Sequence, residues 1–163
     1  MYATVTPDGK LTLGTETFRA ALGYGGIRSD KREGDGATPA GLLPLREVLY
    51  RPDRLPAPAS AVPVKPLTPS DGWCDDPTHP AYNRLVRLPI NASAEALWLD
   101  DAVYDIIGVL GWNDDPVLPG RGSAIFLHIA RQDFSPTEGC IALAPEHLRH
   151  VLARGLTGIR VTA

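Results

Sequence analysis

The sequence has no long hydrophobic run and no marked excess of charge of either sign. Its longest apolar stretch, residues 106–110, is far short of the roughly 18 to 20 residues that a membrane helix needs, so we expect no membrane insertion. The 16 basic and 19 acidic residues are interspersed and leave a net charge of -3. Nucleic acid is bound through a clustered basic surface, and the sequence therefore does not predict nucleic-acid binding.

Cysteine is also scarce, with Cys74 and Cys140 the two present. They could form one disulfide in an exported protein and would stay reduced in the cytoplasm. His79, His147 and His150 lack the paired spacing of a zinc site, and no Asp-rich calcium loop is present. The sequence therefore predicts no metal or other cofactor.

The N-terminus has neither the basic segment nor the apolar segment of an export signal. If Met1 is the native start, we expect a cytoplasmic protein. If Met1 replaces a removed leader, a periplasmic location is the alternative.

What the chain does contain is glycine and proline, 16 of each, with 44% hydrophobic residues in a length of 163. This length closes one substantial core and divides poorly into two. Frequent glycine and proline shorten regular elements and favour strands joined by shaped loops. We therefore predict a single, mainly β domain over residues 1–163, and we expect a monomer.

Apolar and β-branched runs between turn residues predict the strands. The expected extended segments are 2–5, 11–13, 17–22, 42–50, 104–110, 123–130 and 159–161. Asp8 and Gly9 suit a hairpin turn between the first two. Residues 146–154 predict a short helix with an apolar stripe. The proline-rich residues 51–69 predict a rigid extended arm.

One pair of residues carries nucleophilic chemistry. His128 lies in the apolar strand 123–130, where side chains alternate between faces, and Cys140 follows twelve positions later, directly after Gly139. Each residue alone is more typical of a structural role. Together they suit a short loop that brings a thiol to an imidazole, which can accept its proton. Gly139 leaves room beside the thiol, and the N–H groups of Gly139 and Cys140 are candidate oxyanion donors.

These residues resemble the L,D-transpeptidase catalytic domain family of the YkuD type. The family signature is a strand histidine followed by Ser/Thr-His-Gly-Cys and an aliphatic residue. His128, Thr137, Gly139, Cys140 and Ile141 match it. A Thr-Pro-Ala-Gly segment at 38–41 resembles a second family element.

The resemblance implies both a fold and a chemistry. The fold would be a β-sandwich with a short C-terminal helix. Cys140 would attack the carbonyl between an L-centre and the terminal D-Ala of a peptidoglycan stem peptide, and an amine or water would resolve the thioester. His128 would be the general base, oriented by the carbonyl of Ile129. Thr137 and Gly139 would shape the oxyanion site.

The chain departs from the family pattern at three points. Glu138 replaces a histidine, Ala142 replaces an arginine or asparagine, and the loop from histidine to cysteine is short. These changes leave the nucleophile and base in place and bear on substrate recognition. The arginines below could instead be surface charges, and the aromatic and amide residues could pack within a long loop. The candidate substrate-binding residues are Arg131, Arg121, Arg84, Tyr82, Asn83, Trp112 and Glu138.

These observations favour an L,D-carboxypeptidase that trims recycled tetrapeptides with water as acceptor. Its partner would be a peptidoglycan-derived tetrapeptide or muropeptide. One alternative is an L,D-transpeptidase that crosslinks peptidoglycan in the envelope. The other is a catalytically silent peptidoglycan-binding domain, which the presence of both His128 and Cys140 disfavours.

Overall fold

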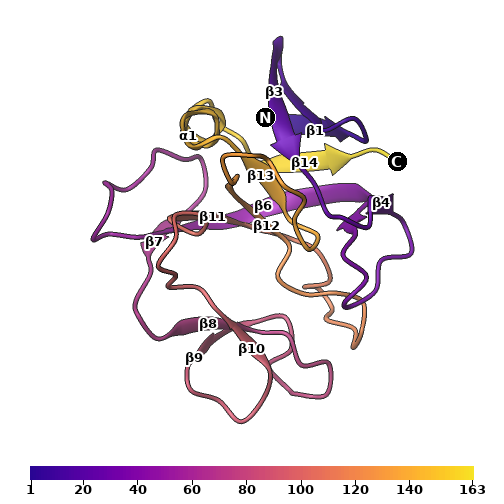
Figure 1. The fold of residues 1–163 in the computed structure, drawn as a ribbon, viewed down its shortest axis with the longest axis vertical. Helices are drawn as coiled ribbons and strands as arrows, with labels where there is room; N and C mark the ends of the chain where they lie inside the picture. The colour runs from indigo at the N-terminus through magenta and orange to yellow at the C-terminus, as the bar shows by residue number, and fades with distance from the viewer.

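The computed structural model describes all residues 1–163 and is built mainly from strands, as the sequence predicts (Figure 1). One short helix, α1 (Pro145–Ala153), lies near the C-terminus. No helix of the structure has the length and apolarity needed to cross a membrane. The strands are β1 (Tyr2–Thr6), β2 (Lys10–Leu13), β3 (Glu16–Ala21), β4 (Ile27–Arg28), β5 (Thr38–Pro39), β6 (Gly41–Tyr50), β7 (Val64–Pro66), β8 (Asp71–Cys74), β9 (Leu85–Arg87), β10 (Ala94–Ala96), β11 (Ile106–Leu110), β12 (Phe126–Ile129), β13 (Ile141–Leu143) and β14 (Gly158–Val161).

Nine strands form one sheet that closes on itself. Their order is β11-β12-β13-β3-β2-β1-β14-β6-β7, and β11 also pairs with β6. Strands β3 and β6 are therefore shared by two layers, β3-β2-β1-β14-β6 and β6-β11-β12-β13-β3. This is the two-layered arrangement expected of the β-sandwich.

The structure has a strand in each predicted segment, but 104–110 is a strand only over Ile106–Leu110 and 123–130 only over Phe126–Ile129. Residues 123–125 are not extended as predicted, because Ala124 has a positive φ of 55°. Strands β1 and β2 pair as an antiparallel hairpin, and Gly9 supplies the positive φ of 75° at its turn. Strand β6 is long enough to pair with β14 through its first half and with β11 through its second half. One long strand thus joins the two layers.

The main core lies between the layers and comprises 21 buried residues. The helix contributes three of them, Leu148, Val151 and Leu152. Pro145 occupies its first turn, where a missing N–H is tolerated. Each fully buried aliphatic side chain stabilises the fold by roughly 1.5 to 3 kcal/mol, so the apolar stripe fixes the helix on the core.

A second, smaller sheet has no counterpart in the predicted strands. Strands β8, β9 and β10 pair in the order β10-β8-β9, and Figure 1 shows them apart from the main sheet. Trp73 of β8 packs in a second apolar cluster with Ile107, Val109 and Phe126. Both faces of β11 and β12 are therefore buried.

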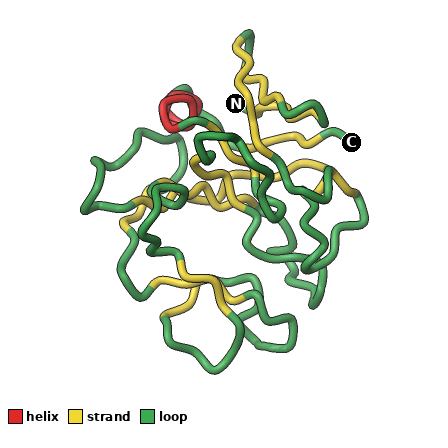
Figure 2. The backbone as a smooth tube through the Cα atoms, in the orientation of Figure 1, coloured by secondary structure: helices red, strands yellow, loops and turns green.

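The proline-rich residues 51–69 were predicted as a rigid extended arm; in the structure they begin with a turn at 52–54, and β7 is their only strand (Figure 2). This strand pairs in parallel with the second half of β6.

Both cysteines are free and buried, so the alternative of a disulfide does not hold. The main and second apolar clusters meet at β12, which carries the residues of greatest chemical interest.

Candidate active site

Parallel pairing of β12 with β13 brings the predicted histidine and cysteine to one cleft. The register sets His128 against Ala142, and Cys140 lies one residue before β13. Leu127 and Ile129 face the main core, whereas Phe126 belongs to the second cluster, which confirms the predicted alternation of β12. His128 and Cys140 both line a cleft of about 540 Å³, a volume typical of small-molecule sites.

His128 is held as a neutral imidazole with one nitrogen free. Its Nδ1 lies 2.9 Å from the carbonyl oxygen of Ile129, so Nδ1 carries the proton and Nε2 is the basic nitrogen. The ring of Tyr104 packs edge-on against it, with ring centroids 5.2 Å apart. Burial lowers the pKa of His128 to about 4, and the ring is therefore uncharged at neutral pH.

The Cys140 thiol is also neutral in this structure. Its Sγ donates to the carbonyl oxygen of Ala124 at 3.3 Å and accepts from the N–H of Phe126 at 3.4 Å. Burial, with a further contribution from the nearby Glu95 carboxylate, raises the pKa of Cys140 to about 12. The structure therefore holds an uncharged thiol and an uncharged imidazole, not a preformed thiolate–imidazolium pair.

The turn before the cysteine is shaped differently from the sequence-based expectation. The N–H of Gly139 donates to Thr137 Oγ1 at 3.1 Å, and the Thr137 hydroxyl donates to the Cys140 carbonyl at 2.7 Å. The Gly139 N–H is thus not available as an oxyanion donor. The N–H of Cys140 has no hydrogen-bond partner within the protein.

Glycine at position 139 is required by the backbone that packs on it. Its φ is +136°, and a Cβ there would come within 2.8 Å of the Ala37 carbonyl oxygen. The space beside Gly139 is therefore occupied by the Ala37 backbone, and Gly139 does not line the cleft. The loop that ends at Ala37 therefore sets the position of the nucleophile's turn.

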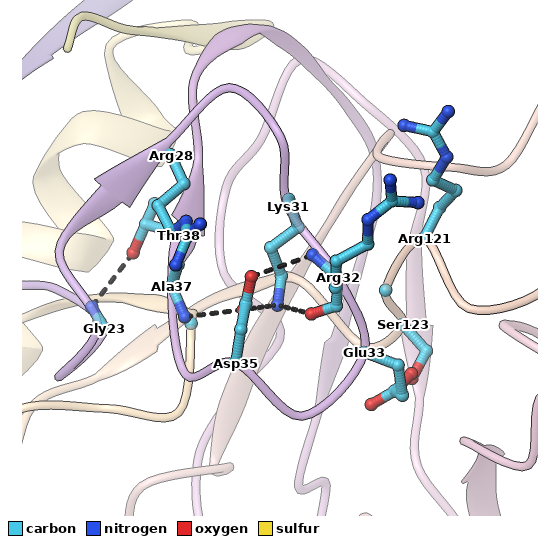
Figure 3. Close-up of polar contacts among 12 residues, drawn as sticks. Gly23, Arg28, Lys31, Arg32, Glu33, Asp35, Ala37, Thr38, Arg121 and Ser123 are labelled. Carbon is cyan, nitrogen blue, oxygen red and sulfur yellow. Dashed lines mark hydrogen bonds and ion pairs between the residues drawn. The ribbon is translucent and has the colours of Figure 1, made fainter.

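That loop is fixed by a small polar network (Figure 3). Lys31 Nζ donates to the Arg32 carbonyl at 2.9 Å and to Asp35 Oδ1 at 2.6 Å. Asp35 also accepts from the N–H groups of Arg32 and Ala37. Burial alone would raise the pKa of Asp35, but these hydrogen bonds together lower it below its usual value. The Asp35 carboxylate is therefore charged, and its hydrogen bonds fix the backbone of residues 32–37.

The Thr-Pro element of the sequence joins this loop to the nucleophile's turn. Thr38 Oγ1 accepts the N–H of Gly23 at 2.9 Å, and Gly23 pairs with Thr137 in an isolated bridge. A Cβ on Gly23 would lie within 3.0 Å of the Gly139 Cα. The two sequence elements that carry the resemblance are thus packed together in space.

Comparison with known protein families agrees with this geometry. The L,D-transpeptidase catalytic domain of the YkuD family matches residues 2–162. The chain belongs to this family. No curated protein matches the chain. The match covers the cleft, both layers of the sandwich and the C-terminal helix, and it supports a cysteine acyltransferase activity of the L,D-transpeptidase kind.

In this L,D-transpeptidase domain the cleft walls come from loops and from the small sheet. Four carboxylates line it, those of Glu33, Asp75, Glu95 and Glu138, with Lys31 and Arg131 as its two cationic residues. Because Lys31 is engaged by Asp35, Arg131 is the exposed cation of the cleft. Its contact with Asp101 is long, at 3.6 Å.

Glu95 and Tyr104 were not singled out by the sequence. Their side chains are hydrogen-bonded to each other, and both line the cleft beside Cys140. Burial raises the pKa of each, which keeps the phenol protonated. Neither residue stands in a motif, and only the packing of β10 against β8 brings Glu95 to the cleft.

The structure brings some predicted substrate residues to the cleft and leaves others outside it. Arg131 and Glu138 line it together with Thr137, His128 and Cys140. Five others do not, because their side chains are engaged elsewhere or point away; they are Arg121, Arg84, Tyr82, Asn83 and Trp112.

Four of these five residues make side-chain hydrogen bonds within the protein, and Arg121 is exposed. Arg84 donates to the Asp114 carbonyl at 3.1 Å, and Trp112 Nε1 donates to the carbonyl of Arg121 at 2.9 Å. Tyr82 and Asn83 are buried, with 3% and 4% of their surface exposed. Of the two readings of the sequence, packing within a long loop is the one that holds for Tyr82 and Asn83. The structure contains no group of three or more His, Cys, Asp or Glu side chains arranged to hold a metal ion.

Proposed function

We propose that this protein is a cysteine L,D-carboxypeptidase that removes the terminal D-Ala from peptidoglycan stem tetrapeptides. The observation that carries the proposal is a thiol and a free imidazole nitrogen lining one cleft in an L,D-transpeptidase catalytic domain. Cys140 is the nucleophile and His128 is the general base.

The acylation step follows from the two neutral groups. The Cys140 S–H, which donates to the Ala124 carbonyl in the structure, turns toward Nε2 of His128, and its proton passes to that nitrogen as Sγ attacks the carbonyl carbon of the scissile L,D bond. The hydrogen bond from Nδ1 to Ile129 keeps Nε2 unprotonated until then. The Cys140 N–H, which has no partner in the protein, is the donor available to the developing oxyanion.

The remaining steps return the proton. The imidazolium gives its proton to the nitrogen of the departing D-Ala, and the C–N bond breaks to leave a tripeptidyl thioester on Cys140. Water then attacks the thioester carbonyl while Nε2 takes one of its protons. The proton returns to the sulfur as the tripeptide leaves, so the thiol and the neutral imidazole are restored.

Substrate recognition rests on the charges of the cleft. Because Lys31 is engaged by Asp35, we propose that Arg131 binds the terminal carboxylate of the tetrapeptide. A guanidinium suits a carboxylate because it offers paired N–H donors. Glu138 lies beside the nucleophile on the same rim and is proposed to contact the substrate's polar backbone.

Water is proposed as the acceptor because the cleft lacks a polar group that the family pattern has two positions after the nucleophile. Ala142 lines it with a methyl group where family members carry a polar residue. An acceptor peptide loses freedom on binding that water does not lose. An L,D-transpeptidase that uses an amine acceptor is the second candidate, and the family match itself favours it. The cytoplasmic location, the single domain and the monomeric state stay predictions.

The test is incubation of the protein with a disaccharide tetrapeptide, with and without an added D-amino acid, followed by mass spectrometry of the products. The proposal expects tripeptide in both reactions and no crosslinked dimer at high acceptor concentration. Exchange of D-Ala for the added D-amino acid, or efficient dimer formation, would assign transpeptidation instead. An unchanged tetrapeptide would leave the silent binding domain as the function.

A further inference from the structure

The segment Gly122–Ala124 is fixed at three consecutive residues by side chains from distant parts of the chain. The N–H of Gly122 donates to the Tyr82 hydroxyl at 3.0 Å. The Ser123 hydroxyl donates to Glu33 Oε1 at 2.7 Å, and Figure 3 shows the ends of the two side chains next to each other. The N–H of Ala124 donates to Asn83 Oδ1 at 3.1 Å.

The carboxylate of Glu33 links the first two of these contacts, because both the Tyr82 and the Ser123 hydroxyls donate to it. Tyr82 donates its hydroxyl proton to Glu33 Oε1 at 2.7 Å, the same oxygen that accepts from Ser123. Tyr82 therefore uses its hydroxyl both as donor to Glu33 and as acceptor from Gly122. Burial, followed by the hydrogen bond to Glu33, raises the pKa of Tyr82, so the donor is present at any physiological pH.

The third contact belongs to an amide with every hydrogen-bonding position used. Asn83 Oδ1 accepts from Trp73 Nε1 at 2.9 Å as well as from Ala124. Its Nδ2 donates to the carbonyls of Trp112 and Asn113 at 2.9 and 2.8 Å. Two donors meet the oxygen and two acceptors meet the nitrogen, so the amide has one orientation. Asn83 also adopts a φ of 57°, a conformation that asparagine tolerates better than most residues.

These three hydrogen bonds hold the Ala124 carbonyl, which is the hydrogen-bond acceptor of the Cys140 thiol. Ala124 has a φ of 55°, a left-handed conformation that is unfavourable for alanine. In that conformation its carbonyl oxygen accepts from Cys140 Sγ at 3.3 Å. Two residues later the Phe126 N–H donates to the same sulfur at 3.4 Å. The direction of the thiol thus depends on a strained residue that Asn83 and Tyr82 stabilise.

We propose that Tyr82 and Asn83 are positioning residues that fix the Ala124 carbonyl and thereby aim the Cys140 thiol. The inference rests on the proposed function for its effect on turnover, but its effect on the thiol can be measured without substrate. Neither side chain lines the cleft, so the two act through segment 122–124.

Loosening the segment has two opposite consequences. Turnover falls, because the sulfur is no longer held in the direction of attack; misplacement of a reacting group by about 1 Å can lower a rate by about 100-fold. Alkylation of the thiol rises, because the sulfur loses its carbonyl acceptor and becomes more accessible. A residue that bound substrate would instead raise KM and leave alkylation unchanged.

The experiment uses Tyr82→Phe, which removes only the hydroxyl, with Tyr50→Phe as its matched control. Tyr50 lies on β6 outside the cleft. We measure kcat and KM on the tetrapeptide, and the rate at which iodoacetamide modifies Cys140, resolved from Cys74 by peptide mass mapping. Tyr82→Phe is expected to lower kcat about 10-fold with KM unchanged, and to alkylate about 3-fold faster; Tyr50→Phe matches the parent in both.

A second variant, Asn83→Gly, keeps the positive φ and removes the amide, and it should shift both quantities further in the same directions. If thermal denaturation shows that Asn83→Gly is not folded, Tyr82→Phe decides alone. A raised KM with unchanged alkylation, or no change in either quantity, would overturn the inference. Faster alkylation of Tyr82→Phe in a protein that turns over no tetrapeptide would refute the proposed function and uphold the positioning role.

Discussion

The two sides of the cleft are built by different means. On one side, His128 and Cys140 are set by the parallel register of β12 and β13 within the closed sheet. On the other, side chains set the backbone of two loops: Asn83, which is 41 residues away in sequence, holds Ala124, and Asp35, which is two residues away, holds the N–H of Ala37. The strand side supplies the reacting groups, and the loop side supplies their orientation.

This difference teaches which part of the site tolerates change. The position of a strand is fixed by many backbone hydrogen bonds and by packing on both of its faces. No single side chain therefore determines it. A loop held by a few side-chain hydrogen bonds depends on each of those side chains. Substitutions on the strand side should therefore remove the chemistry itself, and substitutions on the loop side should weaken its efficiency.

The largest effect should come from the nucleophile. Cys140→Ala is expected to abolish tetrapeptide turnover, because no other thiol lines the cleft. Cys74→Ala should retain most activity, since Cys74 is a buried residue of the small sheet. Product formation measured by mass spectrometry checks both variants. Equal loss of activity in the two would contradict the assignment of Cys140.

The base comes next. His128→Ala should lower the acylation rate by roughly 100-fold or more, the usual scale for a positioned general base. Single-turnover kinetics on the tetrapeptide measure this directly. His147→Ala serves as the control, because His147 lies on α1 and packs against Phe18, outside the cleft. A strong loss in the control with none in His128→Ala would refute the geometry of the strand side.

Burial of His128 should also appear in the pH dependence of stability. Its pKa falls from 6.5 to about 4 on folding, so the unfolded chain binds a proton that the folded protein does not. Protonation of the unfolded chain therefore lowers the free energy of unfolding as pH falls from 6.5 toward 4, by up to about 3 kcal/mol, and has no such effect above pH 6.5.

Urea denaturation between pH 7 and pH 4 measures that loss. The variant His128→Gln lacks the titrating group, and its stability should fall less over the same range. If the free energy of unfolding falls by the same amount in both proteins between pH 7 and pH 4, the imidazole is not buried as the structure has it.

Arg131 should give the smallest of these effects. As the exposed cation of the cleft, it is expected to contribute to carboxylate binding, and Arg131→Ala should raise KM about 10-fold with little change in kcat. Arg121→Ala, which alters an arginine outside the cleft, is the control. If the two variants have the same KM as the parent, the carboxylate is bound by another group.

The sequence was informative where the signal is local. The hairpin at Asp8 and Gly9, the alternation around His128 and the proline-led helix each follow from neighbouring residues, and the structure confirms them. The pairing of His128 with Cys140 was likewise predicted, and both residues line one cleft. These features depend on backbone propensity and on side-chain periodicity, which a single sequence displays.

The sequence was uninformative where distant segments meet. Nothing near Glu95 shows that β10 pairs with β8 and faces the thiol. Nothing near Glu33 indicates its bonds to Tyr82 and Ser123, 49 and 90 residues away. The N–H of Gly139 was expected to be free for an oxyanion, and its hydrogen bond to Thr137 Oγ1 could not be predicted because that bond depends on the shape of the turn. Long-range side-chain contacts fix these positions, and they leave no periodic pattern.

The measurement that tests the central claim most directly is intact-protein mass spectrometry of the enzyme quenched in acid within its first turnovers on tetrapeptide. The account predicts a covalent adduct with the mass of the tripeptidyl acyl group, located on Cys140 by peptide mapping and absent from Cys140→Ala. Turnover of the tetrapeptide with no such adduct at any quench time, or an adduct on Cys74, would contradict it.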